Sequence, residues 1–552
     1  MINPKQTVFD DSTYAATSSV KQNIVTVSTT DRVGTFGWQH SRAWRQLAIL
    51  WQIRVSHRLS QTFSTMPEPA RVCSIAIARE EYDTGLLQYF GMSDVPVAIF
   101  LDRVRLRDTA KLLHVEPSTH YISSKRRHVF CIEQGHRLVD GLPKHVTIFG
   151  EVPLITPLAV GDGSEVLVSL NGVPIITFDN GRLIVGANPW QFGVPGVPML
   201  YKVISNWLRE VGCPHKLPEP CAAVRLDDLP VTAEQLTLRG SARPPNRQSA
   251  RVIRRLRKFG RRTGAKFTLM YSSHFRDSNG RLAPIASIVP RSIRQIQKGI
   301  REGVFEIGSH GMIHLRQTGS PDLDPREFLD LDEEETKAHL DRSEQEILQL
   351  FGGRPHSFVA PAWGYRQGVT KRLAAQRYTV IIDSSQHVES GICDVFLAQS
   401  EDGGCANFAE TFRLGGRMLS YGAPEFWACY ASVGIPIHFM QHTDRNWYIV
   451  RDLIKHDLRN STPNGNWTST FLQYINDPNR PFIVRAICSA LLVTGHFGKL
   501  AASRHLLWRA LTRGSIYAFV RAMQSSGYHC ITLAELYDRV VRSGIIVVPC
   551  EE

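Results

Sequence analysis

The pattern of hydrophobic and polar positions divides the chain into a polar first stretch and two regions with buried-strand patterns. Residues 1–66 are polar and rich in Ser and Thr, so we expect them to be mostly disordered. The exception is a basic amphipathic helix predicted over 41–59, because its Trp and Leu side chains fall on one helical face. That helix would dock on the body of the protein or, alternatively, on an anionic surface.

The region 67–212 has the pattern of an accessory α/β domain. Apolar runs predict buried strands, and Asn171-Gly172 between two such runs predicts a tight hairpin. The expected elements are strands at 72–78, 95–100, 166–170, 173–177 and 181–187 and a closing helix over 197–210.

Residues 213–220 contain three prolines and indicate a linker, after which strand and helix patterns alternate. The alternation favours parallel strands with helices outside, in a barrel or an open sheet, and therefore an α/β fold. We expect this second domain to cover 221–545. Its expected strands are 222–227, 265–271, 304–308, 356–360 and 378–383, and its expected helices are 247–263, 290–302, 325–351 and 367–376.

Composition places the chain among ordinary globular proteins, with 43% hydrophobic and 21% charged residues. Its 10 cysteines are scattered without a CxxC pair, a pattern typical of a reduced protein. The longest apolar run, 482–493, is short for a membrane span and contains Arg485. No basic segment followed by an apolar core marks a signal peptide, so we expect a cytoplasmic protein without a transmembrane segment.

The net charge of +13 raises the question of an acidic partner. The densest basic run, 251–262, carries an apolar stripe at helical spacing, and we interpret it as a solvated helix face. Zinc-finger spacing, an RNA-binding aromatic string and a phosphate-binding loop are all missing from the sequence. We therefore expect no nucleic acid partner.

Two polar clusters stand where apolar strands are expected to end. Asp227 and Asp228 follow one such strand, and His310 follows another, with His314 four positions later. The carboxyl ends of parallel strands are where catalytic groups collect, and two histidines one helical turn apart can hold the same ion. Alternatively, the Asp pair caps a turn, and the histidines are ordinary core and surface residues. An Asp-His-His site with open positions is equipment for a hydrolase.

These clusters resemble the motifs of the polysaccharide deacetylases with NodB homology, over roughly 221–540. The resemblance rests on Arg-Leu-Asp-Asp-Leu-Pro at 225–230, Ser-His-Gly-Met-Ile-His at 309–314 and the closing segment 527–536. It implies a distorted (β/α) barrel and a divalent metal, with Asp227 as general base and Asp228, His310 and His314 as ligands. Zinc is the first expectation, and cobalt or nickel would suit the same ligands.

The region before the linker bears a looser likeness. Residues 136–143, the later hairpin and 181–185 are similar to glutamine-amidotransferase-like α/β domains. No cysteine stands on a nucleophile elbow, so we expect a binding or structural role for this domain.

Three departures from the deacetylase motifs stand out. The third motif usually carries an arginine, whereas 358–365 reads Phe-Val-Ala-Pro-Ala-Trp-Gly-Tyr, similar to a divergent Ala-Pro-Ala-Trp subgroup. The spacing from the Asp pair to the histidines is long, which indicates an insertion within 229–290. The general acid is His442 as first choice, with His438 and His496 as alternatives. Pro361, Trp363 and Tyr365 would bind substrate or, alternatively, pack the barrel mouth.

The sequence therefore predicts a metal-dependent deacetylase acting on an N-acetylated sugar or polysaccharide. Two alternatives stay open, which are a hydrolase of another non-peptide amide and a non-catalytic glycan-binding module. The particular sugar and the oligomeric state do not follow from the sequence.

Overall fold

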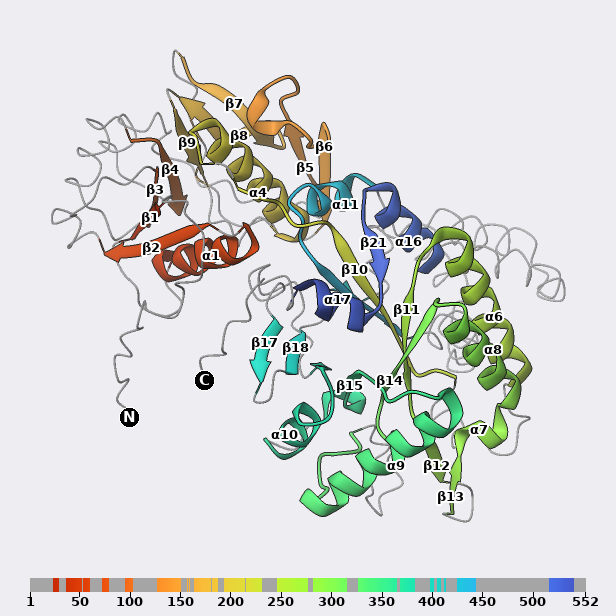
Figure 1. Cartoon of the computed structure of the whole chain (residues 1–552). Coiled ribbons are helices and arrows are strands. Elements are labelled where there is room, and N and C mark those ends of the chain that lie inside the picture. The colour runs from red at the N-terminus through yellow and green to blue at the C-terminus, as the bar shows by residue number, and fades with distance from the viewer. Residues whose placement is uncertain are drawn as a thin grey trace, which may run out of the picture.

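The computed structural model describes most of two β-sheets and the helices that pack on them (Figure 1). The described residues are 23–28, 36–51, 53–59, 72–78, 95–102, 127–149, 156, 158, 163–179, 181–186, 193–213, 215–230, 246–276, 281–314, 326–364, 368–382, 398–401, 405–408, 412–413, 424–442 and 516–540.

The first sheet is a 9-stranded mixed sheet with the order β2-β1-β3-β4-β9-β8-β7-β5-β6. Strands β2 to β9 in that order pair in parallel, and the pairs from β9 to β6 are antiparallel. The expected hairpin around Asn171-Gly172 is confirmed as β7 and β8. The strands are β1 Asn23–Ser28, β2 Arg54–Leu59, β3 Val72–Ala78, β4 Val97–Asp102, β5 Arg127–Ile132, β6 His145–Phe149, β7 Glu165–Leu170, β8 Val173–Asp179 and β9 Arg182–Val185.

The predicted amphipathic helix of the first stretch is confirmed over part of its range, whereas residues 23–28 and 54–59 form strands. Helix α1 (Phe36–Trp51) ends before the predicted boundary, and Arg54–Leu59 is a strand that pairs in parallel with β1. Trp44, Leu47 and Trp51 are buried in the core, so α1 docks on the body of the protein as expected. Burial of these apolar side chains outweighs the polar average of the stretch.

Helix α4 (Gly193–Glu210) and the short helix η3 (Arg137–Val139) accompany the first sheet. Tyr201 and Trp207 of α4 are buried in a core cluster that continues into the second half of the chain through Trp427 and Tyr430. These two residues lie on α11 (Pro424–Ala431), which packs against α4. The two sheets therefore share apolar packing along this boundary.

The second sheet is a 10-stranded, curled and predominantly parallel sheet with the order β17-β18-β16-β15-β14-β11-β10-β20-β19, and β21 pairs with β10. Within this second sheet, β17–β18 is the one antiparallel pair among the described strands. The strands are β10 Cys221–Asp227, β11 Phe267–Tyr271, β14 Phe305–Ser309, β15 Ser357–Val359, β16 Val380–Ile382, β17 Ala398–Glu401, β18 Cys405–Phe408, β19 Phe412–Arg413, β20 Ile437–His442 and β21 His529–Ile531.

Helices connect and cover the second sheet, as the alternating pattern predicts. A small antiparallel pair, β12 (His274–Arg276) and β13 (Leu282–Pro284), lies within the interval where an insertion is expected. The helices are α6 Asn246–Thr263, α7 Ile285–Ile288, α8 Pro290–Arg301, α9 Glu333–Phe351, η5 Pro361–Trp363, α10 Val369–Ala375, α16 Ile516–Ser525 and α17 Leu533–Val540.

Helix α9 begins later than the predicted boundary of 325. Asp332 caps it, accepting a hydrogen bond from the Glu335 backbone N–H, and the Glu335 side chain accepts one from the Asp332 backbone N–H. This reciprocal capping box ends the preceding turn, which leaves Glu327 outside the helix.

Among the described residues, no helix has the length and apolar character to cross a membrane.

Candidate metal centre

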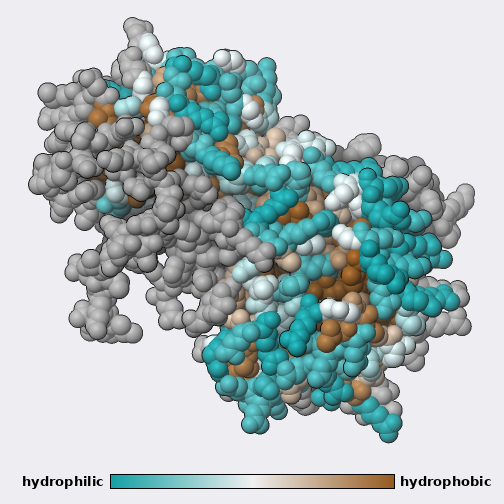
Figure 2. Space-filling view, in the orientation of Figure 1, coloured by the Kyte–Doolittle hydropathy of each residue, from teal (hydrophilic) through white to brown (hydrophobic). Residues whose placement is uncertain are grey.

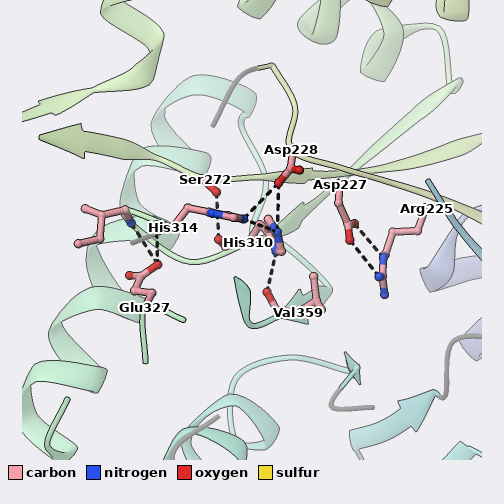
Figure 3. Close-up of polar contacts among 9 residues, drawn as sticks. Arg225, Asp227, Asp228, Ser272, His310, His314, Glu327 and Val359 are labelled. Atoms are coloured by element: carbon pink, nitrogen blue, oxygen red, sulfur yellow. Dashed lines mark hydrogen bonds and ion pairs between the residues drawn. The ribbon is translucent and has the colours of Figure 1, made fainter. Parts of the chain in front are cut away.

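The end of β10 separates two adjacent carboxylates. Arg225 and Asp227 are two residues apart on the strand, so their side chains lie on the same face. Asp228 follows the strand in the left-handed region, with φ of 64°, and its carboxylate points toward the two histidines (Figure 3). A non-glycine residue in this region is uncommon, and such strain is concentrated at functional sites.

The two histidines come from the segment that follows β14. His310 succeeds Ser309, the last strand residue, and His314 has φ of 56°. The helical turn assumed for the His-x-x-x-His spacing is wrong, because 310–314 form bends without helical structure. A positive φ of 78° at Gly311 reverses the chain, and a Cβ there would stand 2.3 Å from a Glu327 carboxylate oxygen. The missing side chain of Gly311 lets the loop 310–314 approach the Glu327 carboxylate.

Asp228, His310 and His314 form the one cluster of three metal-ligating groups among the described residues. The His314 Nε2 atom lies 3.2 Å from Asp228 Oδ1, and His310 Nε2 lies 3.6 Å from the same oxygen. The two Nε2 atoms are 3.1 Å apart. All three residues are buried, with side chains that face one point (Figure 3).

The hydrogen bonding of His310 fits a metal ligand. Its Nδ1 lies 2.9 Å from the Val359 carbonyl oxygen, at the end of β15. Because a carbonyl only accepts, Nδ1 carries the proton, and the Nε2 lone pair faces His314 and Asp228. Tetrahedral zinc ligands stand about 3.3 Å apart, close to the separations found here. The donor set can therefore bind a divalent metal.

Glu327 holds residues 310–314, called the histidine loop below, through hydrogen bonds to their backbone. It is fully buried, and its carboxylate accepts hydrogen bonds from the backbone N–H groups of Met312, Ile313 and His314, at 3.0, 3.1 and 3.0 Å. His339 of α9 donates from Nδ1 to the same carboxylate, at 2.7 Å. Charge-assisted bonds of this kind hold the loop in the conformation that presents His314. Glu327 was not among the predicted site residues, because it lies in an acidic segment whose pattern predicts a helix.

Arg225 forms a two-point ion pair with Asp227. Nε lies 2.8 Å from Oδ1, and Nη2 lies 3.0 Å from Oδ2. Arg225 is fully buried and Asp227 is 2% exposed, so the pair is formed away from bulk water. The third motif lacks its usual arginine, and this contact of Arg225 with Asp227 was not predicted from the sequence.

The candidate general acids lie at different places. His438, on β20, is buried with Nε2 3.5 Å from Arg225 Nη1, so that nitrogen contacts the arginine. The backbone of His442 ends β20 in register with Asp227, at the same edge of the sheet. His496 lies outside the described residues.

The expected substrate-binding residues belong to the segment after β15. Pro361 begins η5 and is buried, and Ala362 beside it has a left-handed φ of 48°. Trp363 ends η5, and its side chain, like the whole of Tyr365, lies outside the described residues. Val359, which precedes this segment, contacts His310 through its carbonyl oxygen.

Comparison with known proteins gives weak similarities. No family model matches the sequence, and neither does any curated protein. Similar solved structures include a candidate polysaccharide deacetylase from Mycobacterium smegmatis, with 13% identity and a TM-score of 0.32 over 60% of this chain and 94% of that one. The Xyl-CE4 domain of a xylanase from the Trinervitermes trinervoides hindgut metagenome has 12% identity and a TM-score of 0.27 over 60% and 95%.

A candidate GMP synthase component from Thermoplasma acidophilum has 13% identity and a TM-score of 0.26, over 34% of this chain and 94% of that one. At identities and TM-scores this low, similarity does not establish the family of the chain.

Proposed function

We propose that this chain is a metal-dependent hydrolase that removes acetyl groups from an N-acetylated sugar or polysaccharide. The observation that carries the proposal is the meeting of Asp228, His310 and His314 at the edge of the curled sheet, next in sequence to the ion-paired Asp227. A carboxylate base next to a metal with open positions suits attack of water on an amide or ester carbonyl. The motif resemblance narrows the substrate to acetylated sugars.

Three residues would hold the metal, namely Asp228 through a carboxylate oxygen and His310 and His314 through Nε2. When bound, a zinc ion or a similar divalent metal supplies a Lewis acid for the carbonyl and lowers the pKa of water. The protein side of this chemistry is the fixed orientation of the ligands. Val359 sets the tautomer of His310, and Glu327 sets the loop that carries His314.

Asp227 is the proposed general base. The guanidinium of Arg225 contacts both carboxylate oxygens of Asp227 and fixes the plane of the carboxylate. A carboxylate next to the proposed metal ligand Asp228 is placed to take the proton that the attacking water gives up. In this role Arg225 takes the place of the arginine that the third motif lacks.

The proposed general acid is His442, which would donate a proton to the departing amine. Support comes from its backbone register with Asp227 at the same sheet edge. His438 is the weaker candidate, because its Nε2 contacts Arg225. Pro361, Trp363 and Tyr365 are proposed to border the substrate, on the basis of their place directly after β15.

The finer fold assignments belong with this proposal. A curled parallel sheet with the site at its carboxyl edge supports a distorted barrel of NodB type over 221–545. The accessory domain over 67–212 is proposed to be glutamine-amidotransferase-like and to bind or support rather than catalyse.

The experiment that tests the function measures acetate release from a panel of N-acetylated oligosaccharides. The protein is stripped of metal and then supplied with zinc, cobalt or nickel. Release restored by metal would support the proposal. A protein that rebinds metal and releases no acetate from any member would contradict it and favour another amide or a binding module.

A further inference from the structure

A basic groove runs between two neighbouring helices of the second sheet. Arg251 and Arg254 of α6 line one side, and Arg291, Arg294 and Lys298 of α8 line the other. The groove has a volume of about 630 Å³, and all five cationic side chains are exposed. None of the described residues that line it is acidic. The surface over α6 and α8 is predominantly hydrophilic, at the right of Figure 2.

The spacing of these cations makes two parallel rows. On α6 the two arginines are three positions apart, and on α8 the cations recur at intervals of three and four. Each interval is close to one helical turn, so each row follows the helix axis for about 5 to 10 Å. Like charges placed this way repel one another, and a bound polyanion would remove that repulsion.

On the α6 side, a hydrogen bond connects the helix that lines the groove to the segment next to the candidate metal centre. Ser249, next to the groove-lining Ala250, donates a hydrogen bond of 2.8 Å to the carbonyl of Pro230, two residues beyond Asp228. The apolar residues of this helix, including Ile253 and Leu256, face the core, which directs the arginines outward. One hydrogen bond therefore joins the first turn of α6 to the segment that follows Asp228.

On the α8 side, backbone hydrogen bonds connect the segment before the helix to the histidine loop. The His274 backbone N–H donates to the carbonyl of Met312 in the histidine loop, at 2.7 Å. Ile285, which begins α7, donates to the carbonyl of Ser273, at 2.8 Å. Helix α7 leads directly into α8, where Arg291 stands in the first turn. Both helices thus lead away from the metal centre.

The lining distinguishes between classes of polyanion. No aromatic side chain is present among its described residues, so it offers no platform for the bases of a single-stranded nucleic acid. Its one apolar residue is Ala250, so it lacks the apolar face by which a helix inserts into a membrane surface. Four of its five cations are arginines, which match carboxylate or phosphate groups with two parallel hydrogen bonds.

We propose that the α6–α8 groove binds an anionic polysaccharide and that this polymer is the substrate class of the neighbouring site. This inference rests on the proposed deacetylase function. The acidic groups of the polymer would lie between the two rows of cations while an acetylated sugar of the same chain reaches the metal centre.

The test measures binding of the metal-stripped full chain to polygalacturonate, with neutral dextran and duplex DNA as comparison ligands. Because no metal or turnover is involved, this test and the acetate-release test can fail independently. The groove variant is Arg254→Gln/Arg294→Gln. Its matched control, Lys258→Gln/Arg301→Gln, removes the same charge from the same two helices outside the groove.

We expect polygalacturonate to bind, dextran not to bind, and the groove variant to bind polygalacturonate about tenfold more weakly or worse than wild type. The control should stay within about twofold. Equal weakening in both variants, or no binding of polygalacturonate, would overturn the proposal. Binding of DNA in preference to polygalacturonate would assign the groove to nucleic acid instead. A second groove variant, Arg251→Gln/Lys298→Gln, should reproduce the loss, and its failure to do so would also contradict the assignment.

Discussion

At the scale of single residues, backbone conformation gives the adjacent carboxylates Asp227 and Asp228 different orientations. Asp227 completes β10 and points to Arg225, whereas the left-handed φ of Asp228 turns its carboxylate to the histidines. The two adjacent carboxylates therefore have separate partners, which suits the proposed roles of Asp227 as base and Asp228 as metal ligand. This division predicts that substitutions at the two positions have different effects.

Asp228→Ala and His310→Ala should each lose the bound metal, because each removes one of the three proposed ligands. Asp227→Asn should retain metal while losing turnover, because the amide cannot take up a proton from water. Elemental analysis of the purified variants measures this directly. Equal metal content in wild type and Asp228→Ala would show that the ligand assignment is wrong.

Arg225→Lys should lower kcat by about ten- to a hundredfold while the metal content stays at the wild-type level. Lysine keeps the positive charge, but it cannot hold both oxygens of Asp227 in one plane. Steady-state kinetics and metal analysis of the same preparation separate the two effects. A parallel loss of metal and activity would mean that Arg225 only supports the fold of the site.

The sequence allowed prediction of the Asp and His cluster, because strand ends and polar motifs are both visible in it. The roles of Arg225 and Glu327 were not predictable in the same way. Arg225 lies inside the apolar strand β10. Its partner is Asp227, two positions along the strand and on the same face, and the contact between them is visible in the structure. Glu327 is one acidic residue among many, and its burial depends on a fold-back of the histidine loop.

At the scale of elements, the loop that carries the second histidine depends on its contact with the turn before α9. Glu327 joins three backbone N–H groups of that loop to His339 on the helix. Gly311 permits the approach, since a side chain there would collide with the Glu327 carboxylate. The position of α9 is thereby coupled to the candidate metal centre.

Glu327→Gln should lower the free energy of unfolding by about 1 to 3 kcal/mol and weaken metal binding by about ten- to a hundredfold. The amide NH₂ would face backbone N–H donors and leave at least one of them without an acceptor. Chemical denaturation and metal titration measure the two changes. Glu334→Gln, in the exposed first turn of α9, is the control and should change neither by much.

Most elements followed from the period of the apolar residues, and those that did not have identifiable causes. Residues 54–59 continue a basic, weakly apolar pattern that suits a helix, but pairing with β1 makes them a strand. The β12–β13 pair consists of strands too short to give an alternating signal. For α9 the acidic run hides the start, which the capping box defines only in the structure.

At the scale of the whole molecule, we expect one buried histidine, His40, and one half-buried histidine, His215, to make the first half of the chain sensitive to acid. Burial, and secondarily the charge of His57, lowers the pKa of His40 to about 3. Burial is also the main cause that lowers the pKa of His215 to about 4. Below the unfolded-state value of 6.5, the unfolded chain binds protons that the folded chain does not.

Stability should therefore be unaffected by these groups above pH 6.5 and should fall as the pH drops from there toward about 4. The measurement is the thermal unfolding midpoint of wild type, followed across that range. His40→Gln should flatten the slope, because it removes one of the protons taken up on unfolding. His145→Gln, at an exposed position, is the control, and a slope equally steep in both variants and wild type would contradict this account.

The measurement that tests the central claim most directly is acetate release from N-acetylated oligosaccharides by wild type and Asp227→Asn, each loaded with zinc to the same content. We predict release by the wild-type protein and a loss of at least about a hundredfold in the variant, because only the base is changed while the ligands remain. Equal release by both proteins, or undiminished release by metal-stripped wild type, would contradict a metal-dependent hydrolase built on these residues.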